Sequence, residues 1–191
     1  MKKSSELLAN VHCRRSFLRH GLAVVSAGLL LPSTAHAITK FAGHEKKLVL
    51  SNTHTGETVR SVFWADGAFV REGLRDINHL LRDFRTGDVA KIDPELLLLI
   101  HNLQHTVEAS APVQIISGYR SPKTNSALRK GSAGVAKKSY HMKGMAIDLR
   151  IEGINLKTLH KAAKSLKGGG VGYYPKSQFI HVDTGPVRYW A

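Results

Sequence analysis

The sequence predicts an α+β domain in which flanking helices pack against a central antiparallel sheet. Two observations support this fold class. The chain has 191 residues, 42% of them hydrophobic and 22% charged, which suits one folded domain. Apolar residues at helical spacing come early in the chain, whereas short strand-like segments cluster late. That order is typical of helices segregated from an antiparallel sheet.

The individual elements follow from local patterns. Two strand-like segments separated by residues 54–56 predict a β-hairpin, which an Asp66-Gly67 turn closes. Asp93-Pro94 predicts a helix N-cap followed by proline at the first helical position. We expect strands at 46–52, 57–64, 113–117, 145–151, 171–174 and 179–183, and helices at 69–84, 94–107 and 155–167. Residues 119–138 are expected to be mostly loop, with one helical turn near 124–128.

The first 37 residues have the order of a secretory signal peptide. A basic start containing Arg14-Arg15-Ser16-Phe17-Leu18 precedes an apolar run at 21–31 and a small-residue site at Ala35-His36-Ala37. The paired arginines resemble the twin-arginine export signal, although a general-secretion signal or an uncleaved anchor remains an alternative. Eleven apolar residues are fewer than the roughly 20 that span a bilayer. We therefore expect cleavage after Ala37, leaving residues 38–191 as an exported domain without a stable membrane span.

The composition of that domain limits which atoms can bind a metal and which partners its charge attracts. Cys13 is the only cysteine, so a metal site in the mature chain must use nitrogen and oxygen ligands. The whole chain has a net charge of +14, and removal of five basic residues and one acidic residue with the signal leaves +10. Such a surface attracts nucleic acid, anionic lipid or acidic wall polymers. Export favours the last two, and a solvated basic face without a partner is the alternative.

Three side chains form a candidate catalytic metal site. Two histidines and one carboxylate, His141, Asp148 and His181, would supply the three protein ligands of a catalytic zinc and leave a position for water. Residues 141 and 148 would face opposite sides of an unbroken strand, but Gly144 permits a turn or bulge between them. We expect His181 to arrive from a neighbouring strand. The alternatives are a strand-capping role for His141 and an arginine partner for Asp148.

These residues resemble a known family. The pattern Ser139-x-His141-x-x-Gly144-x-Ala146-x-Asp148 with a later His181 is similar to the zinc motif of the D-Ala-D-Ala carboxypeptidase-like metallopeptidases. These share their fold with lysostaphin-type peptidases and the hedgehog signalling domain. Three further stretches, at 117–122, 169–175 and 179–186, resemble the arginine loop and other segments of the periplasmic murein endopeptidases within that family.

The resemblance implies a monomeric periplasmic zinc peptidase, without a nucleic-acid partner, that opens peptide cross-links of peptidoglycan, particularly those joining two diaminopimelate residues. It implies that His141, Asp148 and His181 bind Zn²⁺. It also implies that Arg120 pairs with a substrate carboxylate or polarises the scissile carbonyl, for which a planar guanidinium is suited. A structural ion pair is the alternative for Arg120.

One position departs from the family pattern. Many members have Glu or Asp as general base three residues before the last histidine, where this chain has Gln178, which does not titrate near neutral pH. Asp183 lies two residues after His181 and shares its strand face. It is therefore either a replacement base or a hydrogen-bond partner that orients His181, with a plain strand-end hydrogen bond as the third alternative. Because of this departure, a stem-peptide carboxypeptidase and a non-catalytic, zinc-stabilised wall-binding module are rival functions.

Overall fold

The computed structural model describes residues 45–131 and 134–191. The predicted signal segment, residues 1–37, lies outside these ranges. In chain order the elements are β1 (Lys46–Asn52), β2 (Thr58–Ala65), β3 (Ala68–Phe69), α2 (Arg71–Leu80), α3 (Pro94–Thr106), β4 (Val113–Ser117), α4 (Pro122–Gly131), the 3-10 turn η1 (Tyr140–Lys143), β5 (Ala146–Ile151), α5 (Leu156–Ser165), β6 (Gly170–Tyr174), β7 (Phe179–Asp183) and β8 (Arg188–Trp190). None of the helices in these ranges is long and apolar enough to cross a membrane.

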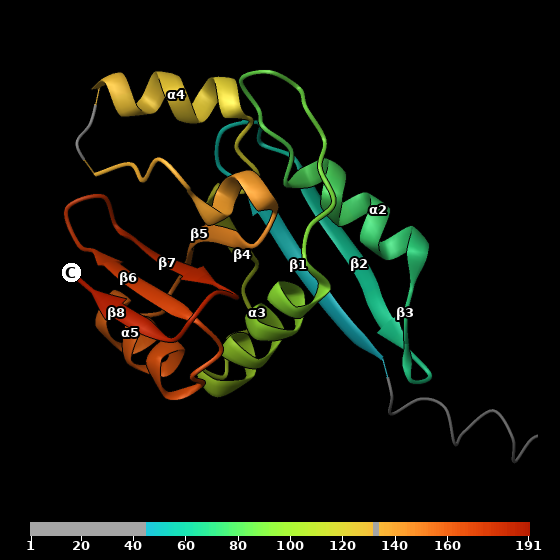
Figure 1. The fold of residues 1–191 in the computed structure, drawn as a ribbon. Coiled ribbons are helices and arrows are strands. Elements are labelled where there is room, and N and C mark those ends of the chain that lie inside the picture. The colour runs from blue at the N-terminus through green and yellow to red at the C-terminus, as the bar shows by residue number, and fades with distance from the viewer. Residues whose placement is uncertain (1–44, 132–133) are drawn as a thin grey trace, which may run out of the picture. The chain divides into compact units, whose positions relative to one another are not determined.

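The eight strands form one sheet in the order β3-β2-β1-β4-β5-β7-β6-β8 (Figure 1). The α+β class is confirmed, but the prediction of an antiparallel sheet is wrong in part. The sheet is mixed, because β1 pairs with β4 and β6 pairs with β8 in parallel. The first pair is joined through α2 and α3, the kind of long crossover that parallel neighbours need. The second arises because the chain reverses after β7 and continues beside the far edge of β6.

The predicted turns and caps explain where the first elements begin. Asp66 and Gly67 both have positive φ, 51° and 84°, as the tight turn between paired strands requires. Asp93 caps α3 by accepting a hydrogen bond from the backbone N–H of Glu95, and Pro94 occupies the first turn. Both features were predicted from the sequence, and both fix an element boundary.

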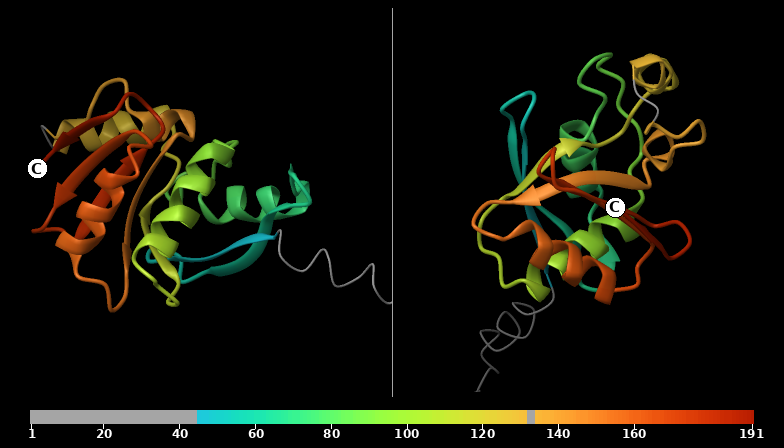
Figure 2. Two further views of the ribbon diagram at one scale, coloured as in Figure 1. Left: turned by 90° about the horizontal axis from the view of Figure 1, so that it is seen from below. Right: turned by 90° about the vertical axis from the view of Figure 1, so that its left-hand side faces the viewer.

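The hydrophobic core lies on one face of the sheet. Inward residues of the central strands, including Leu149 and Ile180, form one buried cluster with residues of α2, α3 and α5 such as Leu97 and Leu159. The alternate residues of β5, β6 and β7 point to the opposite face. Figure 2 shows α4 and η1 on that other side, away from α3 and α5. The candidate ligands Asp148 and His181 therefore lie on the sheet face that α3 and α5 do not cover.

Four elements differ from expectation. The helix expected at 69–84 is limited to α2, Arg71–Leu80, because Phe69 belongs to the unpredicted strand β3, which pairs with β2, and Leu81 is the helix C-cap. Helix α4 spans ten residues instead of one turn. It buries only Thr124 and Asn125, so it gives no apolar periodicity, although proline at its start and basic residues in its last turn were available signals. Strand β8 was not predicted, because three residues are too few for an alternating pattern to emerge.

Candidate metal centre

The sheet register brings two of the predicted ligands side by side. Asp148 on β5 is directly opposite His181 on β7 in an antiparallel pair, and directly opposite residues share a sheet face. The neighbours Ile147 and Leu149 point to the other face and into the core. The expectation that His181 comes from a neighbouring strand is confirmed.

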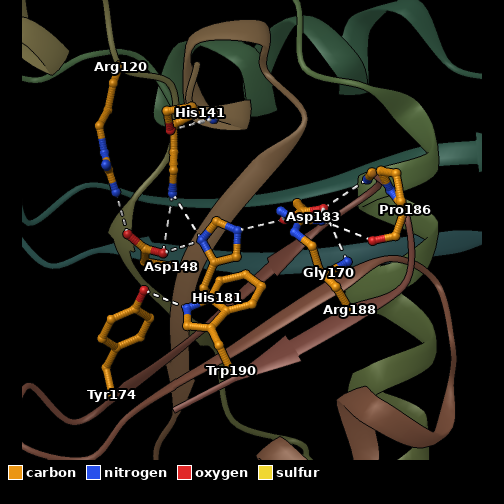
Figure 3. A network of polar contacts seen from close by, with 12 residues as sticks. Arg120, His141, Asp148, Gly170, Tyr174, His181, Asp183, Pro186, Arg188 and Trp190 are labelled. Atoms are coloured by element: carbon orange, nitrogen blue, oxygen red, sulfur yellow. Dashed lines mark hydrogen bonds and ion pairs between the residues drawn. The ribbon is translucent and has the colours of Figure 1, made fainter. Parts of the chain in front are cut away.

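His141 reaches the same place from the 3-10 turn η1 and not from a strand. Ser139 caps this turn by accepting a hydrogen bond from the His141 backbone N–H at 3.3 Å. Gly144 ends it in the left-handed conformation with φ 67°. A Cβ at this position would lie 2.3 Å from the carbonyl oxygen of Lys91, so only glycine fits. The predicted turn at Gly144 is confirmed, and it brings His141 over β5 (Figure 3).

The three side chains present a compact triangle of ligand atoms. His141 Nε2 is 3.2 Å from His181 Nδ1 and 3.3 Å from Asp148 Oδ1, and the last two atoms are 2.9 Å apart. Zinc binds nitrogen and oxygen at about 2.0–2.1 Å, which places tetrahedral ligands about 3.3–3.4 Å from one another. The observed edges are within a few tenths of an ångström of this spacing. The group can hold a metal ion without movement of the backbone.

Each histidine is oriented by a bond from its other nitrogen. His141 Nδ1 donates to the carbonyl oxygen of Gly118 at 2.7 Å, which leaves a lone pair on Nε2 facing the triangle. His181 Nε2 lies 2.9 Å from Asp183 Oδ2. Partners of this kind fix the tautomer and ring orientation of metal-binding histidines. Both imidazoles thus direct the correct nitrogen to the candidate metal position.

Burial and neighbouring charges shift the pKa values of these three groups in opposite directions. Only 2% of His141 and 5% of Asp148 is exposed. Burial lowers the pKa of His141 below its ordinary value. Burial alone would raise the pKa of Asp148, but His141 and His181 hold it well below its usual range. Burial alone would lower the pKa of His181, but hydrogen bonds to Asp148 and Asp183 raise it. The carboxylate is therefore ionised and ready to bind a cation.

Arg120 lies in the same site but is already paired. Its Nη2 donates to Asp148 Oδ2 at 2.6 Å, and its Nε donates to the hydroxyl of Ser117 at 2.9 Å. The arginine loop is anchored from below, since the buried carboxylate of Asp83 accepts a hydrogen bond from the backbone N–H of Ser121 at 2.9 Å. The sequence motif thus places Arg120 beside the ligands, with its charge balanced by one of them.

Asp183 is close to the site but is enclosed by donors. It has no exposed surface. Besides His181, it accepts hydrogen bonds from the backbone N–H groups of Gly170 and Gly185 and from both Nη atoms of Arg188. Burial alone would raise its pKa, but the bonds from His181 and Arg188 lower it far below the ordinary value. Figure 3 shows this carboxylate on the far side of His181 from the ligand triangle.

A cleft of about 660 Å³ opens over the triangle. Its lining residues are Arg120, Gly134, Val135, Ala136, Lys138, Ser139, Tyr140, His141, Asp148, Tyr174, Phe179, His181, Arg188 and Trp190. Asp148 is the only carboxylate among these described residues. Gln178 does not line this cleft; it has a left-handed φ of 56° and contacts the carbonyl of Pro175.

Sequence reasoning missed Trp190 and the role of Arg188. The Trp190 ring lies 5.2 Å from the ring of His181, and its Nε1 donates to the hydroxyl of Tyr174 at 2.8 Å. It fits because Gly172 lacks a Cβ, which would lie 2.5 Å from the indole. No pattern near the C-terminus other than its aromatic residues indicated that Trp190 packs beside His181.

The comparisons with known proteins agree with this site. Residues 40–190 match the model of the family described as "Peptidoglycan L,D-endopeptidase MepK". The chain belongs to this family. The "Peptidoglycan L,D-endopeptidase MepK" proteins of Escherichia coli K12 and Shigella flexneri are each 46% identical over 177 residues, covering 93% of this chain and 96% of theirs. The "Probable peptidoglycan L,D-endopeptidase MepK" of Haemophilus influenzae is 47% identical over 144 residues, covering 75% and 77%. The MepK matches confirm the resemblance to murein endopeptidases found in the sequence.

Proposed function

We propose that this chain is a zinc-dependent murein endopeptidase that hydrolyses peptide cross-links of peptidoglycan, including links between two diaminopimelate residues. Its MepK relatives carry the name peptidoglycan L,D-endopeptidase. The observation that carries the proposal is the triangle of His141, Asp148 and His181 at the base of an open cleft. A site of two histidines and one carboxylate with solvent access is typical of metallopeptidases.

Zinc is the metal that we propose, because the donors are two imidazoles and one carboxylate in a near-tetrahedral arrangement. Bound there, it would supply a Lewis acid and water that is activated near neutral pH. The chain's own residues hold the ligands in place. The Gly118 carbonyl fixes the tautomer of His141, and Asp148 faces the same position from β5.

We propose that Arg120 polarises the scissile carbonyl. Two of its nitrogens are occupied by Ser117 and Asp148, and its remaining Nη1 has no partner among the described residues. Because Nε and Nη2 are occupied, a two-pronged contact with a carboxylate is not available, whereas a single carbonyl oxygen can accept from Nη1. A carbonyl oxygen that becomes negative during the reaction needs a fixed donor of this kind.

For Asp183 we propose a positioning role and not that of general base. Five donors surround its two oxygens, so no lone pair faces the cleft to accept a proton from water. The bond from His181 Nε2 instead fixes the orientation of that ring.

Digestion of purified sacculi tests the activity. The domain 38–191, loaded with zinc, should convert cross-linked muropeptides into monomers, as separated by chromatography and identified by mass. A chelator and His141→Ala should each abolish this conversion, because both remove the metal. Unchanged conversion by His141→Ala would refute the ligand assignment.

Two rival functions give different products. A stem-peptide carboxypeptidase would shorten monomers and leave dimers intact. A wall-binding module, which Gln178 in place of an acid would suit, would bind stoichiometric zinc and sediment with sacculi but release no product.

We also propose that residues 1–37 are a cleaved twin-arginine signal and that residues 38–191 form a monomeric periplasmic domain of the hedgehog and D-Ala-D-Ala-peptidase type. Support comes from the basic, apolar and small-residue order of the segment and from the metal site on an open sheet face. Replacing Arg14 and Arg15 with lysine should stop export of a tagged protein. Undiminished export would exclude the twin-arginine route, and light scattering tests the monomer. We expect no specific binding of nucleic acid.

A further inference from the structure

The arginines near the metal site differ in whether a carboxylate already neutralises them. Arg120 is paired with Asp148 at 2.6 Å, and Arg188 is paired with Asp183 at 2.7 Å. Arg150 has no ion pair within the described ranges. The substrates proposed above carry free carboxyl groups on their peptide stems. A cation without a protein partner is the one that gains most from binding such a group.

Arg150 lies on the same strand and the same face as Asp148. The two residues are separated by one position on β5, so their side chains point to the same side of the sheet, about 7 Å apart along the strand. Arg150 is directly opposite Gln114 on β4. Its Nε donates to Gln114 Oε1 at 2.7 Å. That bond orients the guanidinium. Nη1 and Nη2, the two-pronged end that matches a carboxylate, have no partner among residues 45–131 and 134–191.

This guanidinium lines a second cavity of about 690 Å³. The residues that line it are Gln114, Arg150, Ile151, Glu152, Ile154, Asn155, Leu156, Lys157, Tyr173 and Gln178. The cavity shares no lining residue with the metal cleft, and its link to that cleft is Arg150 itself, which lies on the same face of β5 as Asp148. Glu152 is exposed and forms no ion pair with Arg150 in the described structure.

We infer that Arg150, held by Gln114, binds a free carboxylate of the peptide stem while the scissile bond lies at the metal site. This inference rests on the proposed function and assigns a substrate subsite to it. Because positions 148 and 150 are about 7 Å apart along β5, the carboxylate is one that lies near the scissile bond. Arg120 and Arg150 then have separate tasks: the neutralised arginine contacts the reacting carbonyl, and the unpaired arginine recognises charge.

Two synthetic cross-linked peptides that differ only at this carboxyl group, free in one and amidated in the other, test the inference. The wild-type protein should prefer the free acid by about 10- to 100-fold in kcat/KM, the range expected for a charge-assisted bidentate contact. Arg150→Gln should lose this preference and cleave the free acid and the amidated peptide with similar kcat/KM. Lys161→Gln removes the same charge from an exposed position of α5 outside the cavity and should keep the preference.

Binding provides a readout that does not depend on hydrolysis. Calorimetric titration of metal-free protein should show tighter binding of the free acid, and Arg150→Gln should abolish the difference. If Arg150→Gln does not fold, Gln114→Met, which removes the orienting bond, should lower the preference several-fold. Equal binding and cleavage of both peptides by the wild-type protein, or a preference that survives in Arg150→Gln, would overturn the inference. A binding preference without any hydrolysis would support the subsite and refute the proposed endopeptidase.

Discussion

Replacement of Asp183 by asparagine separates the two roles that the sequence left open for this residue. Asp183 Oδ1 accepts from Gly170, Gly185 and Arg188, whereas Oδ2 faces His181 Nε2 and a second Arg188 nitrogen. The single amide oxygen of asparagine best serves the three donors at the Oδ1 position. Its N–H₂ group then faces His181 Nε2, which must become an acceptor. The proton of a neutral His181 therefore moves to Nδ1, the nitrogen that faces the metal position.

The expected cost follows from this change of tautomer. Loss of an orienting partner of a metal-binding histidine typically weakens metal binding 10- to 100-fold, or about 1.4–2.7 kcal/mol. We therefore expect Asp183→Asn to raise the zinc dissociation constant by this factor, measured by competition with a chromogenic chelator. At saturating zinc, turnover of cross-linked muropeptides should recover to within a few-fold of the wild-type rate.

Arg188→Gln is the matched control, because it removes the guanidinium but keeps the carboxylate that faces His181. Both variants lose an ion pair in which the arginine side chain is 40% exposed but the carboxylate is fully buried, so the loss should cost about 1 kcal/mol or more. Arg188→Gln should be destabilised yet bind zinc with nearly wild-type affinity. If Asp183→Asn instead bound zinc normally and lost turnover at every zinc concentration, Asp183 would be the general base and the positioning argument would be wrong.

Three further predictions concern the support of the site. Burial alone would raise the pKa of Asp83, but hydrogen bonds from Thr124 and Ser121 lower it to about 2. The ionised Asp83 carboxylate therefore stabilises the fold fully above the ordinary pKa near 4, and this stabilisation is lost as the pH falls through 2. Asp83→Asn should cost about 2 kcal/mol in urea unfolding at pH 7 and much less at pH 2.5; an equal cost at both would contradict this. Gly144→Ala, with φ 67° and a Cβ 2.3 Å from the carbonyl of Lys91, should lower stability by about 2 kcal/mol or more and weaken zinc binding, whereas an unchanged Tm would exclude the close contact. Chelation should lower the unfolding free energy by about 2.7 kcal/mol when free zinc had been 100-fold above its dissociation constant, and an unshifted Tm would mean that the native state holds no metal.

Local signals were sufficient for much of the fold. The Asp66-Gly67 turn and the Asp93-Pro94 cap are encoded by residues whose backbone preferences act over one or two positions, and both occur where predicted. Sheet order is set by contacts between distant segments, and no local pattern distinguishes a parallel β1–β4 pair from an antiparallel one. The sequence predicts only one turn of helix α4, because the helix is mostly exposed and has almost no buried apolar residues that would produce a helical pattern.

At the candidate metal centre, the sequence predicted the candidate ligands but not the partners that orient them. His141, Asp148 and His181 were singled out because their pattern resembles a family motif, whereas histidines and aspartates on strands are often structural. The bond of His141 to the Gly118 carbonyl could not be found in this way, since every residue has a carbonyl. Nor could the pairing of Asp183 with Arg188, which depends on how the chain turns after β7.

The pairing of the arginines is the clearest case in which only the structure decides a role. The family resemblance assigned Arg120 either to a substrate carboxylate or to the scissile carbonyl, because a guanidinium suits both; the alternative was a structural ion pair, and the structure contains one with Asp148. The bonds of Arg120 to Ser117 and Asp148 favour the carbonyl, since they leave Nη1 alone for the substrate among the described contacts. We proposed Arg150 as the cation that recognises substrate charge, because it lies on the same sheet face and its two Nη atoms have no partner among the described residues. A single variant with a charge-matched control therefore tests whether charge recognition and carbonyl polarisation are divided between the two arginines.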